Sequence, residues 1–121
     1  TLQRALAEAR EAADRAAAAN GVRVEWRHVW RIDPCRFDPA LVDLCAEAVT
    51  ETTGHAPRLP SGPLHDAVEM GRVMPSVMMF AQSLRGLSHC KEEDTREADL
   101  VASLDAFQRL IDKTLVHVAA A

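Results

Sequence analysis

Two histidines carry the chemistry that this sequence could perform. His65 lies in the segment Leu59-Pro60-Ser61-Gly62-Pro63-Leu64-His65-Asp66-Ala67, and His89 follows 24 residues later in the segment Ser83-Leu84-Arg85-Gly86-Leu87-Ser88-His89. A neutral imidazole nitrogen is a good ligand for zinc. Each segment also contains a glycine, which lets the backbone come close to a ligand. A single loop histidine is more often structural or solvated, so a functional interpretation depends on the pair.

Both histidines are predicted to lie where extended backbone turns into a helix. His89 follows the apolar run Val77-Met78-Met79-Phe80-Ala81, which is typical of a strand covered on both faces of a parallel sheet. His65 directly precedes a second expected helix. Ligands in open α/β sheets bind at the carboxyl ends of the strands. The functional hypothesis therefore requires the two imidazoles to converge at one edge of the fold.

Helices are predicted on both sides of these segments from apolar periodicity and capping residues. The first covers residues 1–19 and ends at Asn20-Gly21. Another starts at Asp38-Pro39, where aspartate caps and proline occupies the first helical position, and ends at Gly54. The last runs from about residue 95 to 118, with the apolar face Leu100, Val101, Leu104, Phe107, Leu110, Ile111 and Leu115. The acidic residues Glu92, Glu93, Asp94 and Glu97 suit the positive end of its dipole.

Residues 22–32 alternate between two faces, which predicts a long strand with one solvated face. The drier face carries Val22, Val24, Trp26, His28, Trp30 and Ile32. That face could belong to a core or meet another subunit. From residue 38 onward, helices and strands alternate, which predicts an α/β fold: a partial layered sheet with flanking helices. A break at residues 33–37 suggests a domain boundary.

Bulk properties restrict the class of protein. The formal net charge of −4 argues against a nucleic-acid-binding surface. No apolar run approaches the roughly 20 residues that a membrane span needs. Three cysteines without a C-x-x-C pair favour a reducing cytoplasm over a disulfide framework. The sequence begins at Thr1 within a helical pattern, as expected for a fragment of a longer protein.

Together, the two histidine segments resemble the C-terminal signature of the hydantoinase/carbamoylase family, amidohydrolases of the wider M20 metallopeptidase group. This family includes N-carbamoyl-L-amino acid hydrolases, allantoate amidohydrolases and β-ureidopropionase-like enzymes. Its pattern reads P-S-G-A-G-H-D-A, then a strand, then S-x-x-G-[IL]-S-H-x-x-x-E. The present sequence has Pro60-Ser61-Gly62-Pro63-Leu64-His65-Asp66-Ala67 and Ser83-Leu84-Arg85-Gly86-Leu87-Ser88-His89, with Glu93 four residues on. The order and spacing of the two motifs are more specific than either motif alone.

The resemblance implies a domain organisation and a set of cofactors. Family members have a catalytic domain with two divalent metals, zinc or manganese, and an inserted lid domain that also forms the homodimer. By this likeness, residues 1–33 would be the tail of the lid/dimerisation domain. Residues 34–121 would be the C-terminal part of the metal-dependent catalytic domain.

The resemblance also implies roles for individual residues. His89 matches the final metal ligand, and His65 matches a catalytic histidine that holds the scissile amide or its tetrahedral intermediate. The other implied substrate-binding positions are Ser61, Gly62, Arg85 and Gly86. Cys90 could be a soft extra ligand, although an inert neighbour is the simpler interpretation.

Two departures from the family limit these expectations. Pro63-Leu64 replaces the usual Ala-Gly before the histidine, which removes a backbone donor and bars the closest approach. By the same likeness, the family's earlier H-x-D stretch, its paired metal-site glutamates and its further histidine have no counterpart in this sequence. Because a catalytic zinc needs at least three protein ligands, the chain alone is expected to retain no metal and to be inactive.

For the parent enzyme we expect metal-dependent hydrolysis of the C–N amide bond in N-carbamoyl amino acids or ureido acids. An M20 aminoacylase or dipeptidase is the nearest alternative, and carbamoyl against acyl substrates would separate the two. A non-catalytic α/β association module that uses residues 22–32 is a third possibility. Substituting Trp26 and Trp30 and measuring mass in solution would test that role.

Overall fold

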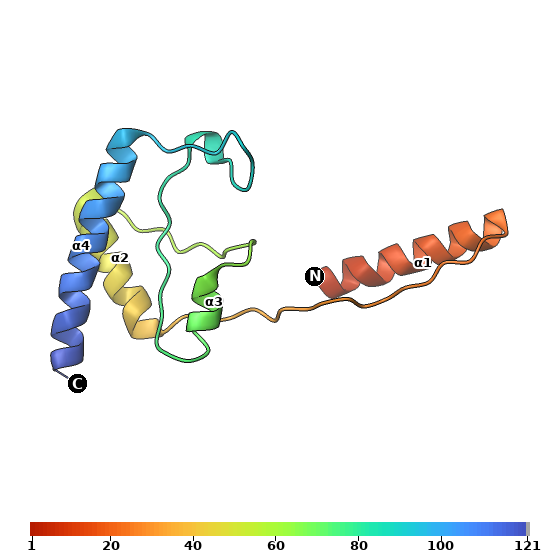
Figure 1. The fold of residues 1–121 in the computed structure, drawn as a ribbon, viewed down its shortest axis with the longest axis horizontal. Helices are drawn as coiled ribbons and strands as arrows, with labels where there is room; N and C mark the ends of the chain where they lie inside the picture. Colours follow the sequence, from red (N-terminus) through yellow and green to blue (C-terminus); the bar gives the residue numbers. More distant parts are fainter. Residues whose placement is uncertain (121) are drawn as a thin grey trace. The chain divides into compact units, whose positions relative to one another are not determined.

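The computed structural model describes residues 1–120 of the chain. Its elements are α1 (Leu2–Asn20), α2 (Pro39–Thr53), α3 (Asp66–Met70), the 3-10 turn η1 (Leu84–Gly86) and α4 (Glu97–Ala119) (Figure 1). The chain divides into two compact units, Thr1–Pro34 and Cys35–Ala121. Within the described residues, no helix combines the length and the apolar character needed to cross a lipid bilayer.

The first unit consists of α1 and an extended tail. α1 ends at Gly21, whose φ of 64° is left-handed and whose N–H donates to the carbonyl of Ala17, so the predicted glycine stop is confirmed. The tail is extended and includes Trp26, which lies under the guanidinium of Arg10 at 5.4 Å from the ring centroid. Trp30 is 69% exposed. A cation–π contact thus ties part of the tail to α1.

The second unit begins with α2, whose ends are also fixed locally. The Oδ1 of Asp38 accepts a hydrogen bond of 3.0 Å from the backbone N–H of Leu41, and Pro39 occupies the first turn. At the other end, Gly54 adopts a left-handed φ of 84°. Both predicted caps are confirmed, and they set the helix bounds independently of tertiary packing.

The core of this unit lies between α2 and α4, which run side by side (Figure 1). The buried residues are Cys45 and Ala48 from α2 and Ala106 and Leu110 from α4. Cys45, Ala48 and Leu110 form one cluster, and the partly buried residues packed against it are Leu44, Val49, Val77 and Met79. Burial raises the pKa of the Cys45 thiol above its usual value of 9.0, so this cysteine behaves as a small apolar residue.

Ion pairs flank the same helix contact. Lys113 Nζ of α4 lies 2.8 Å from Glu51 Oε1 and 3.3 Å from Glu47 Oε2 of α2. The hydrogen bond from Lys113 lowers the pKa of Glu51 below 4.5. The hydrogen bonds that Lys113 donates to Glu51 and Glu47 raise the pKa of Lys113 above 10.5. These groups are solvated, so each pair makes only a small contribution to stability.

We expect this charge cluster to make the second unit less stable in acid. Because the folded pKa of Glu51 lies below 4.5, its contribution is present above the unfolded value and is lost as the pH falls through the folded value. The contribution of Lys113 is present below 10.5 and is lost as the pH rises through its higher folded pKa. Thermal unfolding followed by circular dichroism across acid pH would measure the first effect. Lys113→Met should weaken the acid dependence, and an unchanged dependence in this variant would contradict the assignment.

The predicted α/β fold is wrong for this structure. Residues 1–120 form helices and extended segments but no β-strand. Residues 22–32 and 77–81, both predicted to be strands, have no regular secondary structure, and neither pairs with a neighbouring strand. A strand exists only through backbone hydrogen bonds to a partner. Near the second segment, the closest such bond is from the N–H of Asp38 to the carbonyl of Ser76 at 3.0 Å, and no ladder continues it.

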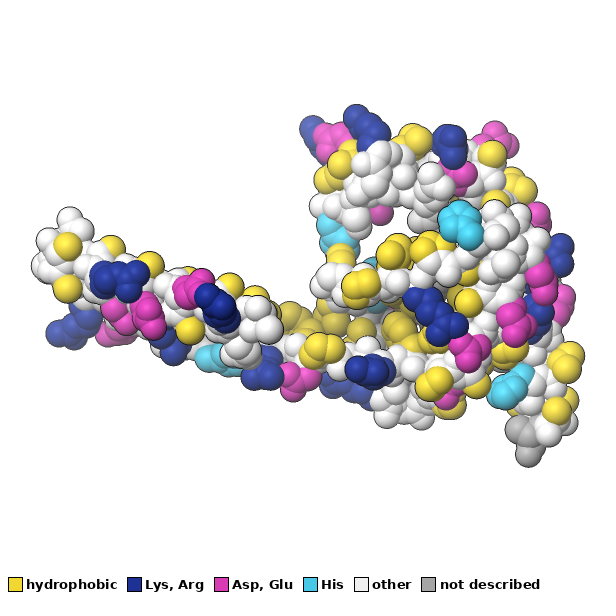
Figure 2. Space-filling model, turned by 180° about the vertical axis from the view of Figure 1, so that it is seen from behind, with side chains coloured by type: hydrophobic (Ala, Val, Ile, Leu, Met, Phe, Trp, Pro, Cys, Tyr) yellow, Lys and Arg dark blue, Asp and Glu magenta, His cyan; other side chains and the backbone are white. Residues whose placement is uncertain are grey.

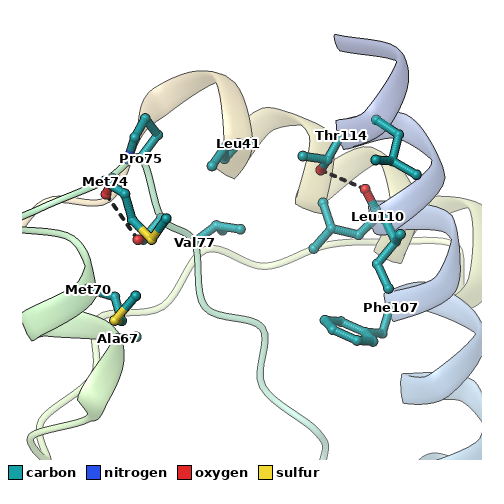
Figure 3. A pocket seen from close by; sticks show the side chains of 12 residues that line it. Leu41, Ala67, Met70, Met74, Pro75, Val77, Phe107, Leu110 and Thr114 are labelled. Atoms are coloured by element: carbon teal, nitrogen blue, oxygen red, sulfur yellow. Dashed lines mark hydrogen bonds between the residues drawn. The ribbon is translucent and has the colours of Figure 1, made fainter. Parts of the chain in front are cut away.

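Large apolar side chains remain on the surface of the second unit. On α4, Leu104 is 60% exposed and Phe107 is 51% exposed, and hydrophobic atoms are visible across the molecule in Figure 2. An open hollow of about 440 Å³ lies among α2, α3, the turn that follows it and α4 (Figure 3). It is lined by Leu41, Ala67, Met70, Met74, Pro75, Ser76, Val77, Phe107, Leu110, Ile111, Thr114 and Leu115. Neither His65 nor His89 lines this hollow, so it is separate from the histidine pair.

Candidate metal and substrate site

His65 occupies the junction between an extended segment and α3. It is the residue before the helix, with φ −130° and ψ 153°, and its side chain makes no capping hydrogen bond. The residue is half-buried, and its Nε2 atom is buried without a hydrogen-bond partner among residues 1–120. Because a buried polar atom without a partner costs free energy, this nitrogen is available for a ligand.

His89 lies in the loop between η1 and α4 in an unusual backbone conformation. Its φ is 57°, in the left-handed region that residues with a Cβ rarely adopt. Its backbone N–H donates a hydrogen bond of 2.7 Å to Glu93 Oε2. The loop is closed at its base because the N–H of Leu84 donates to the carbonyl of Asp94 at 2.7 Å. The His89 ring is therefore presented by a closed loop rather than by a regular element.

The two histidines meet in space. Their ring centroids are 6.5 Å apart, and the ring planes cross at 74°. The Phe80 ring lies 6.3 Å from the His65 ring at 72°, which gives an edge-on aromatic contact. The structure therefore brings together two imidazoles separated by 24 residues, one at the residue before α3 and one in the loop before α4. The rings are close, as the functional hypothesis requires, but two loops place them rather than the predicted edge of a sheet, and the roles of both residues stay predictions.

Comparison with known proteins decides the family. Residues 6–113 match the family model described as Peptidase family M20/M25/M40, which covers most of the chain. The chain belongs to this M20 family. The family resemblance indicated by the two histidine motifs is thereby confirmed.

Curated M20 relatives align over most of the chain. The chain is 32% identical over 107 residues to a probable allantoate deiminase from Oryza sativa subsp. japonica. This alignment covers 81% of the present chain and 22% of that protein. The chain is 31% identical over 94 residues to an N-carbamoyl-L-amino-acid amidohydrolase from Rhizobium meliloti, covering 78% and 23%. A putative hydrolase from Mycolicibacterium smegmatis is 31% identical over 97 residues, covering 78% and 22%. The chain thus spans less than a quarter of these relatives, and no solved structure matches it.

The residues of this M20 chain fit part of a metal site. Two imidazoles at close range, one with an unpartnered buried nitrogen, are suitable donors for zinc or manganese. Among residues 1–120, however, no group of three or more His, Cys, Asp or Glu side chains could hold a metal ion. Cys90 is exposed and free and belongs to no such group. The donors present are therefore fewer than the three that a catalytic zinc site uses.

The other predicted substrate-binding residues are less well defined by contacts. The Ser61 hydroxyl donates to the carbonyl of Pro63 at 3.0 Å, so it stabilises its own loop. Gly62 has open space where a Cβ would lie. Arg85 and Gly86 form η1 with left-handed φ values of 58° and 66°. Within the described part of the chain, no hydrogen bond or ion pair joins these four residues to the histidine pair, and their roles stay predictions.

Two neighbours of the histidines have structural contacts that the sequence interpretation did not assign. The sequence places Phe80 in the apolar run of residues 77–81, and nothing in that pattern indicates a contact with His65. Glu93 was interpreted as a residue that suits a helix dipole, although its position four residues after His89 was part of the motif. The structure instead directs its carboxylate to the backbone of His89.

Proposed function

We propose that this chain contributes the His65–His89 pair to a two-metal amidohydrolase that cleaves C–N bonds of N-carbamoyl amino acids or ureido acids. The observation that carries the proposal is the approach of the two imidazoles to 6.5 Å, with His65 Nε2 buried and unpartnered. Membership of the M20 family supports it. The names of the rice and Rhizobium relatives support this substrate class.

Each histidine has a distinct role in this proposal. The His89 imidazole acts as a metal ligand through a ring nitrogen. His65 donates a hydrogen bond to the oxygen on which negative charge develops during attack on the carbonyl. When bound, the divalent metals supply an activated water and polarise the carbonyl. The half-buried position of His65 strengthens its hydrogen bond because the surroundings are less polar than water.

The remaining ligands and the general base are proposed to come from elsewhere in a longer polypeptide. The relatives are more than four times the length of the aligned region, as their 22–23% coverage requires. We therefore propose that residues 1–121 alone do not catalyse the reaction. A homodimer formed through residues 1–33 and a cytoplasmic location are also part of the proposal.

A hydrolysis assay tests the proposed function. The enzyme is a polypeptide of about the relatives' length that contains this chain, here named the long form. We expect the long form to release ammonia from an N-carbamoyl amino acid or a ureido acid in the presence of zinc or manganese, and to lose this activity in a chelator. The isolated 121-residue chain is the matched control and should release no ammonia above the blank.

The same assay separates the proposal from its nearest alternative. N-acyl amino acids and dipeptides are offered to the long form beside the carbamoyl and ureido substrates. Cleavage of only the acyl or dipeptide substrates would favour an aminoacylase or dipeptidase. Ammonia release that survives the chelator would contradict metal dependence.

A further inference from the structure

The segment that contains His89 includes residues in the unfavourable left-handed backbone conformation. Arg85, Gly86 and His89 all have φ between 57° and 66°. Glycine adopts this region freely, whereas a residue with a Cβ pays a free-energy cost to stay there. His89 is exposed, so packing alone does not impose its left-handed conformation. A specific contact must stabilise it.

Glu93 makes that contact. Its Oε2 accepts the backbone N–H of His89 at 2.7 Å, a short hydrogen bond to a charged acceptor. The N–H of Glu93 donates to the carbonyl of Cys90 at 3.1 Å, which folds the chain back in a turn. The side chain therefore reaches back over this turn to the residue that carries the predicted metal-binding ring.

The neighbouring acidic residues have different partners. Glu92 Oε1 lies 3.5 Å from Lys91 Nζ. Asp94 Oδ1 accepts the N–H of Thr95 at 2.8 Å. Within the described residues, Glu93 is the only member of this acidic run whose side chain bonds to His89. The three adjacent residues all have carboxylate side chains, so charge alone does not distinguish them. They differ in position, and only Glu93 reaches the backbone of His89.

We propose that Glu93 is a positioning residue that holds His89 in its left-handed conformation and thereby turns the His89 imidazole toward His65. The carboxylate acts on the backbone of His89, not on its ring. That the position of the His89 ring matters for metal binding rests on the proposed function. The effect of Glu93 on the His89 backbone is inferred independently from the two hydrogen bonds and the φ angle of His89.

Nuclear magnetic resonance on the labelled chain tests the proposal without metal or substrate. A left-handed residue has its amide and Hα protons closer together than a residue with negative φ, so His89 should show an intense amide–Hα cross-peak within the residue. Cross-peaks between the ring protons of His65 and His89 report the approach of the imidazoles. We expect Glu93→Ala to lose both signals. Glu93→Gln, which retains an oxygen acceptor, should keep them.

Glu92→Ala is the matched control, since it removes a carboxylate from the same turn without touching His89. It should keep both signals. If Glu93→Ala keeps both signals, or Glu92→Ala loses them equally, the positioning role is overturned. Loss of the helical circular dichroism signal in Glu93→Ala alone would also overturn it, in favour of a general stabilising role. An inactive long form with this pattern of signals intact would refute the proposed function and leave the positioning role standing.

Discussion

Replacing Leu110 with alanine is expected to destabilise the second unit by about 2–5 kcal/mol, the usual cost of removing a buried leucine side chain. Leu110 is 6% exposed and is the one large side chain among the buried residues of the α2–α4 contact. The others, Cys45, Ala48 and Ala106, are small and cannot expand to fill the space. Because domains are stable by only about 5–15 kcal/mol, this change removes a large fraction of the stability. Urea unfolding monitored by circular dichroism would measure it.

Leu104→Ala provides the matched control for this prediction. It makes the same chemical change six residues earlier on α4, at a side chain that is 60% exposed. Its effect should stay within about 0.5 kcal/mol, as for other surface substitutions. Equal destabilisation by the two variants would contradict the assignment of the core to the Leu110 face.

The helices could be predicted from sequence because their ends depend on neighbouring residues. Asp38 caps α2 through a bond to a backbone N–H three residues away, and Gly21 and Gly54 adopt the left-handed angles that stop α1 and α2. Such signals are complete within one turn of helix. The bounds of α1, α2 and α4 accordingly lie within about two residues of their predicted positions, the usual uncertainty of helix ends.

The sheet was wrongly predicted because pairing is not a local property. Alternation over residues 22–32 predicts a strand, but it does not specify a hydrogen-bonding partner, and the structure has no strand there. Of the seven residues of the apolar face of α4, Leu110 alone is buried, because a single helix–helix contact covers a narrow stripe of a helix surface.

The sequence predicts which residues form the candidate site, but it predicts their arrangement in space only in part. Both histidines were identified from their motifs. Their approach depends on the left-handed turn at His89 and on the extended backbone before α3. No periodic pattern encodes these angles. The hydrogen bond that Glu93 Oε2 accepts from the backbone N–H of His89 is equally hidden in the sequence, because a glutamate at this position also suits the positive end of the helix dipole.

Alanine substitutions at the two histidines are expected to have different effects in the long form. His65→Ala should lower kcat by about 10²–10³-fold, the range for loss of one oxyanion donor, while the bound metal is retained. His89→Ala should lower the metal content and abolish hydrolysis, because the proposed metal site loses one of its ligands. Metal analysis after gel filtration and steady-state kinetics on the same preparations would measure both effects.

His55→Ala is the control for these two variants, because His55 is an exposed histidine of the same unit whose backbone carbonyl, not its ring, accepts the hydroxyl of Thr53. It should leave both kcat and metal content unchanged. Loss of metal in His65→Ala would make His65 a ligand as well, which the 6.5 Å between the ring centroids permits. Full metal content and activity in His89→Ala would contradict the proposed metal site at this loop. Because the three variants remove the same side chain from one structural unit, a difference among them reports the position of the imidazole rather than its general chemistry.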